Sequence, residues 1–394
     1  MRRSAPALAA STERPRPRVL VVGHGPPTTG GIPTYVARLA SDGRLRSAVE
    51  VEFLNTAPSG VKHPGSFSFS NLRSTAAHAR RTFRGGRRAD VVHLNLAPVP
   101  VLPLLRAMVL ATAARMAGSR VVLHAHTGRM EAEVLKPLYR TLLRSSRRLV
   151  DVFVVVSEQG ARALRTAGID PVVLENGVDP AEFATGPKRT TPPMVVFVGT
   201  VCERKGLLDL RDALDRMRAE GGPLPDLVIV GDGQQEGPGA FERVRAAYAR
   251  SGLTDVEFTG PLPFERVRAV LAEAAVFCLP SHWEACPLSV LEAMAAGSAV
   301  VATSVGEIPV MLDHGRAGIL VEPHDPAALA AALQGILADP GERERLGEAA
   351  RARIEQVYDW DRMVDRLFDL YRRLAGRRRH RPFMRRRPRR SSGS

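Results

Sequence analysis

The sequence predicts an α/β protein of two domains, each built around a doubly wound parallel sheet. Its 394 residues are too many for one ordinary hydrophobic core. Short β-branched runs alternate with helical stretches in both halves, which is typical of parallel strands joined by crossover helices. Between the two series, residues 180–193 are rich in Pro, Gly and Thr and interrupt the alternation. We therefore expect an interdomain linker there.

In the first half, apolar β-branched runs predict six strands, and longer amphipathic stretches predict the helices between them. The strands are expected at 19–23, 51–54, 90–95, 120–124, 152–156 and 172–175. The helices are expected at 32–41, 101–117 and 132–148. Doubly wound sheets bind ligands beyond the carboxyl ends of their strands, so functional residues are expected in the loops that follow the strands.

The second half has the same architecture without a repeated sequence. Its strands are expected at 194–199, 226–231, 256–259, 275–279, 299–303 and 318–321. Its helices are expected at 207–219, 240–251, 264–274, 288–296, 326–338 and 341–357, with a last amphipathic helix at 361–375. Two facing sheets would place a ligand cleft between them, with the linker as its hinge.

The net charge of +15 is concentrated at the two ends of the chain. Residues 377–390 contain nine arginines and no acidic residue, and residues 1–18 contain five arginines and one glutamate. We expect a disordered basic arm at 1–17 and a disordered Arg-rich tail at 376–394. Anionic lipid, nucleic acid or solvent alone could accommodate such a tail, and all three remain open. The nearly neutral body and the aromatic content of 5% make a nucleic-acid partner unlikely.

Cysteine usage and hydropathy indicate the compartment. Cys202, Cys278 and Cys286 give no disulfide framework and lack the paired spacing of a zinc site. The most apolar stretch, 99–118, is interrupted by two arginines and two prolines, so no membrane span is expected. We predict a cytoplasmic protein.

Glu284 and Glu292 are the most informative pair of residues. Glu284 lies in the loop after the strand at 275–279, and Glu292 lies about a turn and a half into the next helix. Two carboxylates beside a helix N-terminus can hold sugar hydroxyls, while the helix amides can hold phosphate. An isolated pair of this kind is more often solvated, so the pair alone does not decide the function.

Two other loops carry residues suited to a phosphate. Gly30 and Gly31 precede a helix and leave backbone amides open to a ligand. Arg204 and Lys205 also precede a helix, and a planar fork beside a mobile point charge suits a diphosphate. A simple turn explains the first pair about as well, and exposed surface charge explains the second.

His124 and His126 end the strand at 120–124, and alternation points both side chains to one face. No carboxylate or cysteine nearby completes a metal site, so no metal is expected. A histidine at a strand end can hydrogen-bond a polar substrate, although a packed structural histidine is a real competitor. The only Asp-x-Asp string, residues 359–361, opens the last helix and is interpreted as helix capping.

In their order and spacing, these segments resemble the retaining glycosyltransferases of family four, which have the GT-B fold. The resemblance covers about residues 18–373. It also rests on Asn176-Gly177-Val178-Asp179, Val230-Gly231-Asp232-Gly233, Phe258-Thr259-Gly260 and Glu292-Ala293-Met294-Ala295-Ala296-Gly297. It implies two facing Rossmann-like domains with an interdomain cleft, the acceptor domain at 18–182 and the nucleotide-sugar domain at 190–358. The helix at 361–375 would cross back to the first domain.

The resemblance assigns roles to individual residues. Arg204 and Lys205 would hold the donor diphosphate, Glu292 the ribose diol, and Glu284 and His124 the donor sugar. The residues assigned to catalysis are Glu284, His124, Arg204 and Lys205; those assigned to donor binding are Gly30, Gly31, Gly199, Arg204, Lys205, Gly260, Leu288, Ser289 and Glu292. One loop departs from the family pattern, because Glu307 replaces the second glycine of Gly-Gly-x-Pro-Glu and Val310 replaces its glutamate.

The function implied is retaining transfer of a sugar from a nucleotide-sugar donor, with no cofactor and no metal. The acceptor would be a glycan or a lipid-linked molecule in bacterial exopolysaccharide or cell-envelope glycan synthesis. The Arg-rich tail adds a second hypothesis, a peripheral position on the inner face of the cell membrane. A nucleotide-sugar epimerase of similar two-domain architecture is the alternative. The donor base, the sugar, the acceptor and the oligomeric state stay open.

Overall fold

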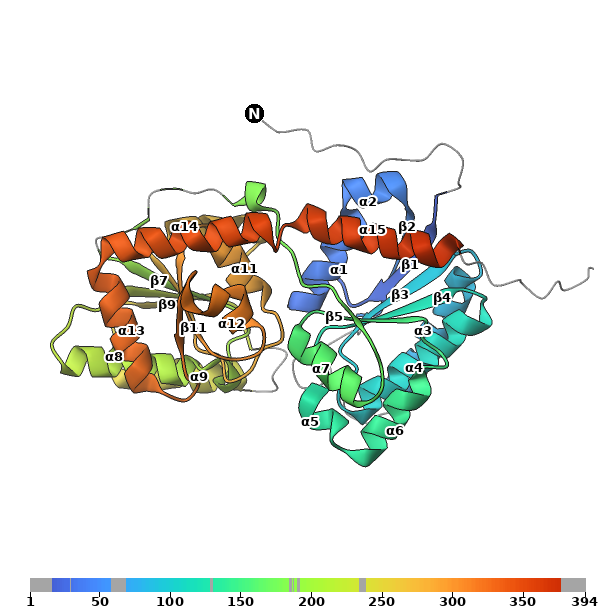
Figure 1. The fold of residues 1–394 in the computed structure, drawn as a ribbon. Coiled ribbons are helices and arrows are strands. Elements are labelled where there is room, and N and C mark those ends of the chain that lie inside the picture. Colours follow the sequence, from blue (N-terminus) through green and yellow to red (C-terminus); the bar gives the residue numbers. More distant parts are fainter. Residues whose placement is uncertain are drawn as a thin grey trace, which may run out of the picture.

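Two wholly parallel six-stranded sheets form the protein, in two lobes that lie side by side (Figure 1). The structure is a computed structural model, and it describes residues 16–376 except for 29, 58–68, 128–129, 184–185, 187, 190–191 and 234–238. The predicted fold class is confirmed. The predicted tail at 376–394, apart from Gly376, and the predicted arm at 1–17, apart from residues 16 and 17, lie outside the described residues.

The N-terminal domain is a sheet of order β2-β1-β3-β4-β5-β6 with helices on both sides. Its central strands are largely apolar, and all six residues of β3 are buried, including His93 and Asn95. The strands are β1 (Arg18–Gly23), β2 (Glu50–Asn55), β3 (Val91–Leu96), β4 (Arg120–Ala125), β5 (Val152–Val155) and β6 (Val172–Val173). The helices are α1 (Gly31–Ser41), α2 (Gly43–Ala48), α3 (Phe69–Gly86), α4 (Val101–Met116), α5 (Met130–Val134), α6 (Pro137–Ser146) and α7 (Glu158–Thr166).

The C-terminal domain is a sheet of order β12-β11-β10-β7-β8-β9. Its strands are β7 (Met194–Val198), β8 (Asp226–Val230), β9 (Val256–Gly260), β10 (Val276–Leu279), β11 (Ala299–Thr303) and β12 (Ile319–Val321). Its helices are α8 (Leu207–Ala219), α9 (Ala240–Ser251), α10 (Phe264–Glu273), α11 (Leu288–Ala295), α12 (Ile308–Met311), α13 (Pro326–Ala338) and α14 (Pro340–Gln356). Three short 3₁₀ turns are η1 (Pro180–Glu182), η2 (Glu203–Lys205) and η3 (Asp313–Gly315). The strand order reverses between β7 and β10, and ligands bind at such a switch point.

Most predicted ranges agree with the structure to within two residues at each end, but four helices were missed and one was wrong. The predicted helix at 132–148 is two helices, because Pro137 starts α6 and disfavours helical geometry at Lys136 before it. The missed helices are α2, α3, α7 and the short α12. No helix in the described part of the chain is long and apolar enough to cross a lipid bilayer.

The last helix, α15 (Trp360–Gly376), leaves the C-terminal domain and lies across the N-terminal one (Figure 1). Its buried side chains pack in one cluster with residues of β1 and α1. Two polar contacts fix its position: Trp360 Nε1 donates to Asp42 Oδ2 (2.8 Å), and the Tyr371 hydroxyl lies 2.6 Å from His93 Nδ1. The chain therefore crosses between the domains twice, once at the linker and once before α15.

We predict that Leu367→Ala lowers the free energy of unfolding by about 2–5 kcal/mol, because it leaves a cavity where the side chain is fully buried. Chemical denaturation followed by circular dichroism measures the loss. Arg373→Ala, at an exposed position of the same helix, is the control and should stay within about 0.5 kcal/mol of wild type. Equal stability of the two variants would contradict the packing of α15 described above.

Candidate active site

A buried ion pair lies at the switch point of the C-terminal sheet. Glu284 follows β10 and Lys205 follows β7, and the Lys205 ammonium contacts Oε1 of Glu284. Both residues are buried, with 8% exposure for Glu284 and 9% for Lys205. The Ser281 hydroxyl donates to the same oxygen (2.8 Å), and Thr303 Oγ1 donates to the Ser281 carbonyl (2.5 Å). The structure thus brings together two predicted site residues and adds Ser281, which sequence reasoning missed.

Glycines allow the loops around this pair to approach one another. Gly206 has a φ of 69°, and a Cβ there would overlap the Pro280 carbonyl. Gly306 has a φ of 60°, and a Cβ there would overlap the Glu284 carbonyl. These positions favour glycine for both conformation and space. The position of Glu284 is therefore determined by the backbone as well as by Lys205.

Arg204 lies beside the pair and is partly exposed, unlike Lys205. Its guanidinium carbon is 4.5 Å from the centroid of the Trp283 ring, and its carbonyl accepts from the His282 amide (2.9 Å). The expectation that Arg204 and Lys205 act alike therefore needs a correction. Lys205 is engaged by a carboxylate inside the domain, whereas Arg204 lies nearer to solvent, where an incoming anion can reach it.

The other carboxylate of the pair, Glu292, lies on α11 and is half-buried. Burial raises its pKa to about 7, while Arg38 on α1 acts in the opposite direction and Glu182 raises it further. Arg38 belongs to the N-terminal domain and pairs with Glu182 (3.0 Å). Glu292 therefore lies where the two domains meet, and its burial favours the protonated form.

The start of α11 provides open amides near Glu292. Its N-cap is Pro287, and no side chain caps the helix, so the first-turn amides around Leu288 and Ser289 lack a capping partner. Leu288 packs against the cores of both domains. This helix N-terminus thus lies at the domain junction, with the polarity that favours an anion.

The predicted glycines differ in their surroundings. Gly30 and Gly31 are exposed at the uncapped start of α1, and a Cβ on Gly31 would meet nothing within 4 Å. Gly260, at the end of β9, also faces open space. By contrast, the Gly199 amide donates to the Val230 carbonyl (3.0 Å) within the sheet. Gly199 therefore has a structural partner in place of an open amide.

His124 lies deeper in the N-terminal domain than a residue at a strand end was expected to lie. Its ring is fully buried and is stacked between His93 (5.4 Å between centroids) and His126 (4.1 Å), so it presents no surface to a sugar. His126 follows the end of β4, is partly exposed, and places Nε2 3.1 Å from Asn95 Oδ1. The two rings lie on the same face of the sheet, as strand alternation predicted. Only His126, which follows the end of β4, reaches the surface.

Burial keeps the histidine cluster neutral at physiological pH. It lowers the pKa of His93 and of His126 to about 3, and it holds the pKa of His124 well below 6.5. A neutral imidazole can donate a hydrogen bond to a hydroxyl from one nitrogen and accept one at the other. His126 is therefore suited to a sugar hydroxyl and not to neutralising a phosphate.

The loop that departs from the family pattern connects the two domains. Glu307 is buried, its amide donates to the Ala285 carbonyl (2.9 Å), and its Oε2 accepts from the Glu158 amide (3.1 Å) at the start of α7. A carboxylate is favourable at a helix N-terminus. Val310 is exposed at 36%, and its carbonyl accepts from Arg353 Nη2 (2.7 Å). Glu307, which stands where the family pattern has a glycine, thus makes a hydrogen bond between the two domains.

Three more titratable side chains meet just behind this site. Asp209, His282 and His324 are the one group of potential metal ligands found among the described residues. Two cavities, of about 510 and 270 Å³, lie elsewhere, between α8 and α9 and where residues 175–176 meet the loop before α15. Neither is lined by a residue of the predicted site.

Known proteins match the chain over nearly all of its described length. A family model described as Glycosyltransferase Family 4 matches residues 18–182, and one described as Glycosyl transferases group 1 matches residues 192–339. The glycogen synthase of Mycobacterium tuberculosis is 28% identical over 408 residues, covering 92% of this chain and 95% of that protein. The phosphatidyl-myo-inositol mannosyltransferase of the same organism is 28% identical over 373 residues, covering 88% and 94%.

A solved structure agrees with the fold. The Anabaena protein HepE in complex with UDP-glucose superimposes with a TM-score of 0.70 at 19% identity, covering 90% of this chain and 99% of that one. At that identity the likeness extends to the fold alone. Both matching family models describe glycosyltransferases, so they give no support to the epimerase alternative.

The raised pKa of Glu292 predicts a pH-dependent stability. The folded-state pKa of about 7 lies above the ordinary 4.5, so protonation favours the folded state and the contribution of Glu292 declines as pH rises between these values. Glu292→Gln removes this decline. The unfolding midpoint of the variant should therefore rise relative to that of the wild type as the pH increases from about 5 to about 8.

Thermal unfolding at each pH measures the difference between the two proteins. Glu348→Gln removes an exposed carboxylate of α14 and serves as the matched control. A wild-type-minus-variant difference that stays constant over this range, as in the control, would show that Glu292 ionises normally.

Proposed function

The chain belongs to the family 4 glycosyltransferases with the GT-B fold, and we propose that it transfers a sugar from a nucleotide-sugar donor with retention of anomeric configuration. The arrangement at the switch point of the C-terminal sheet carries this proposal. A buried acid–base pair, a more exposed arginine and an uncapped helix N-terminus converge there. These are the groups that a sugar diphosphate requires.

In the proposed donor complex, the diphosphate binds Arg204 and the first-turn amides of α11 around Leu288 and Ser289. Negative charge grows on the departing phosphate oxygen, and fixed donors stabilise it there most strongly. Arginine and helix amides supply this stabilisation without a metal ion at the reacting centre. Glu292 accepts hydrogen bonds from the ribose hydroxyls, and it does so best when ionised.

Glu284 is proposed to hold hydroxyls of the donor sugar, with Lys205 as its positioning residue. The ion pair and the Ser281 hydroxyl fix the orientation of the carboxylate through Oε1, and Oε2 is proposed to accept from the substrate. His126, with Gly30 and Gly31, lines the opposite side from the N-terminal domain. His124 supports the His126 ring by stacking on it.

We propose a front-face displacement for the chemical step. The bond between the anomeric carbon and the diphosphate oxygen breaks, and the acceptor oxygen forms its bond on the same face. The acceptor proton passes to the departing phosphate oxygen, so no protein nucleophile is needed. This distinguishes the scheme from the two-carboxylate route of retaining glycosidases.

The donor is identified by a thermal-shift panel of UDP, GDP and ADP sugars. One of them should raise the unfolding midpoint, and a ligand at 100 times its Kd adds about 2.7 kcal/mol of stability. Arg204→Gln should abolish the shift and lower turnover at least tenfold, whereas Arg216→Gln, an exposed arginine of α8 that pairs with Glu220, should leave both unchanged.

Product analysis completes this test. NMR of the product is expected to show the anomeric configuration of the donor. An inverted product would contradict retention, and no midpoint shift with any nucleotide sugar would contradict the donor class. Conversion of the donor to an epimer in the absence of acceptor would favour the epimerase alternative instead.

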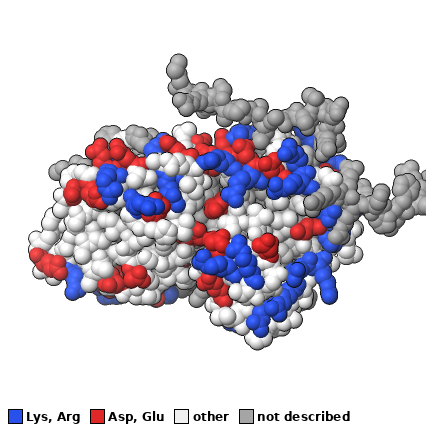
Figure 2. All heavy atoms as spheres, in the orientation of Figure 1, with Lys and Arg blue, Asp and Glu red and all other residues white. Residues whose placement is uncertain are grey.

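A membrane surface is the proposed location of the acceptor. Large apolar side chains are exposed on the outer helices of the N-terminal domain, at Phe69 (78%), Leu72 (61%), Met116 (73%) and Leu138 (63%). The same helices carry many exposed arginines, and Figure 2 shows basic residues gathered on this lobe. Apolar anchors among cations favour an anionic bilayer surface.

Two further observations support a membrane location of the acceptor. The Arg-rich segment 377–390 adds nine cations that follow α15 directly. The mycobacterial relative acts, by its name, on phosphatidyl-myo-inositol, a lipid acceptor. We therefore propose a lipid-linked or membrane-proximal glycan acceptor in bacterial cell-envelope or exopolysaccharide synthesis, at the inner face of the membrane.

Vesicle sedimentation measures this association. The full chain should sediment with anionic vesicles and not with neutral ones. Truncation after Gly376 and the double variant Phe69→Ser, Leu72→Ser should each reduce the bound fraction severalfold, because each removes one of the two attractions. Equal binding of the full chain to anionic and neutral vesicles would contradict the electrostatic part, and no binding to either would contradict the membrane location.

A further inference from the structure

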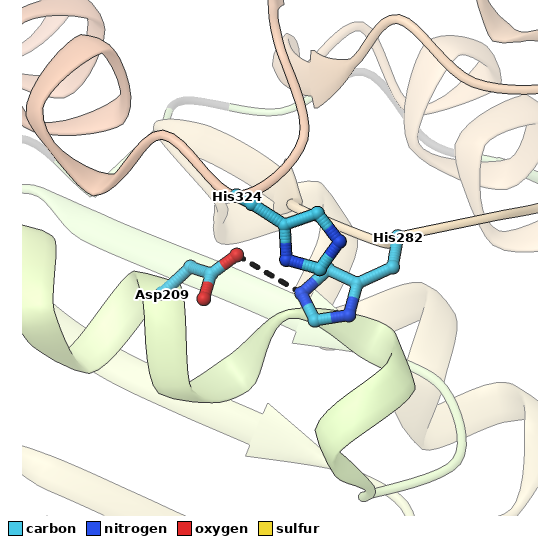
Figure 3. Close-up of side chains that lie close together, drawn as sticks. All are labelled: Asp209, His282 and His324. Carbon is cyan, nitrogen blue, oxygen red and sulfur yellow. Dashed lines mark hydrogen bonds and ion pairs between the residues drawn. The ribbon is translucent and has the colours of Figure 1, made fainter.

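Asp209, His282 and His324 come together from three separate segments of the C-terminal domain. Asp209 lies on α8, His282 lies in the loop after β10, and His324 lies between β12 and α13. One potential ligand atom from each lies within 4.8 Å of the others. His282 Nε2 is 3.0 Å from Asp209 Oδ2, and the two imidazole centroids are 3.7 Å apart (Figure 3).

The donor set is that of a divalent transition metal. Two imidazole nitrogens and one carboxylate oxygen suit Zn²⁺, Co²⁺ or Ni²⁺, whereas Ca²⁺ and Mg²⁺ prefer oxygen ligands alone. Three protein ligands leave a fourth position open to water. The side chains of Asp209 and His282 are 18% and 22% exposed, and His324 is exposed, so an ion and its water can reach them.

We propose that Asp209, His282 and His324 form a binding site for one Zn²⁺-like ion, which fastens the loop that carries Glu284 to the start of α8. Each of the three side chains already has one ligand atom within 4.8 Å of the others, so one ion could contact all three. In its absence, the Asp209–His282 hydrogen bond and the contact between the tilted imidazole rings of His282 and His324 hold the same three segments together.

The site lies directly behind the proposed donor site. The His282 amide donates to the Arg204 carbonyl (2.9 Å), and His282 precedes Glu284 by two residues. Asp209 lies three residues after Gly206, in the first turn of α8, the helix that follows Arg204 and Lys205. A bound ion would therefore reduce the motion of both loops that hold the Lys205–Glu284 pair. This effect on the donor rests on the proposed function, whereas metal binding itself does not.

Direct titration tests the site. The full chain, without a histidine tag and after treatment with EDTA, is titrated with Zn²⁺ by calorimetry and with Co²⁺ by visible absorption. We expect one tight site per chain. His324→Ala, His282→Ala and Asp209→Asn should each weaken it at least tenfold, since each removes one of three ligands.

His314 provides a matched control. It is also exposed, lies in the same domain, and has a left-handed backbone (φ 55°) as His324 does (φ 62°). His314→Ala should keep full metal affinity. If His324→Ala binds Zn²⁺ as tightly as wild type and His314→Ala, the proposed site is wrong. Circular dichroism of each variant verifies that it is folded.

Donor binding is then measured with and without the metal. The identified nucleotide sugar should bind severalfold more tightly to the Zn²⁺-loaded chain than to the EDTA-treated chain, and His324→Ala should lose this difference. Unchanged donor affinity would overturn the coupling to the donor site. A chain that transfers sugar but binds no metal would overturn the metal site and leave the proposed function intact.

Discussion

The buried pair of Lys205 and Glu284 is the interaction on which the rest of the site depends. Two charges with 9% and 8% exposure tolerate burial only because each compensates the other and because Ser281 satisfies the carboxylate further. Removing one partner of such a pair typically costs about 3–5 kcal/mol, since the other charge is left uncompensated. We therefore expect Lys205→Ala to destabilise the fold as well as to disturb the site. The pair determines where the β7 and β10 loops lie, and so where a ligand can bind.

Contacts across the domain boundary place the second half of the site. Asn176 Nδ2 donates to the Cys286 carbonyl (2.8 Å), and Glu307 accepts from the amide of Glu158. Helix α15 fills the core of the N-terminal domain although it follows the C-terminal one in the chain. These connections fix α1, with Gly30 and Gly31 at its start, relative to the loop after β10.

The sequence was sufficient for the sheets and insufficient for several side chains. Buried parallel strands are continuous β-branched runs, so their ranges could be read directly. Helix α3 is rich in polar and basic residues and fully buries only Thr82 and Gly86, so it lacks the apolar residues that mark the predicted helices. His124 lies within β4 and His126 lies directly after its last residue. Strand ends predicted from sequence are not accurate enough to separate two such positions. Asp209 and His282 are 73 positions apart, and only the folded loops bring them together. The pairing of Lys205 with Glu284 was invisible for the same reason, although each was named.

The two carboxylates of the site are compensated in different ways, and this difference links domain approach to nucleotide recognition. Glu284 has its cation, Lys205, inside its own domain, so this half is formed before any ligand arrives. The cation that favours ionisation of Glu292 is Arg38, which belongs to the other domain and also pairs with Glu182. A closer approach of α1 favours the ionised carboxylate, and the ionised carboxylate is the better acceptor for ribose hydroxyls. By thermodynamic linkage, a nucleotide that binds ionised Glu292 must in turn favour the approach of α1.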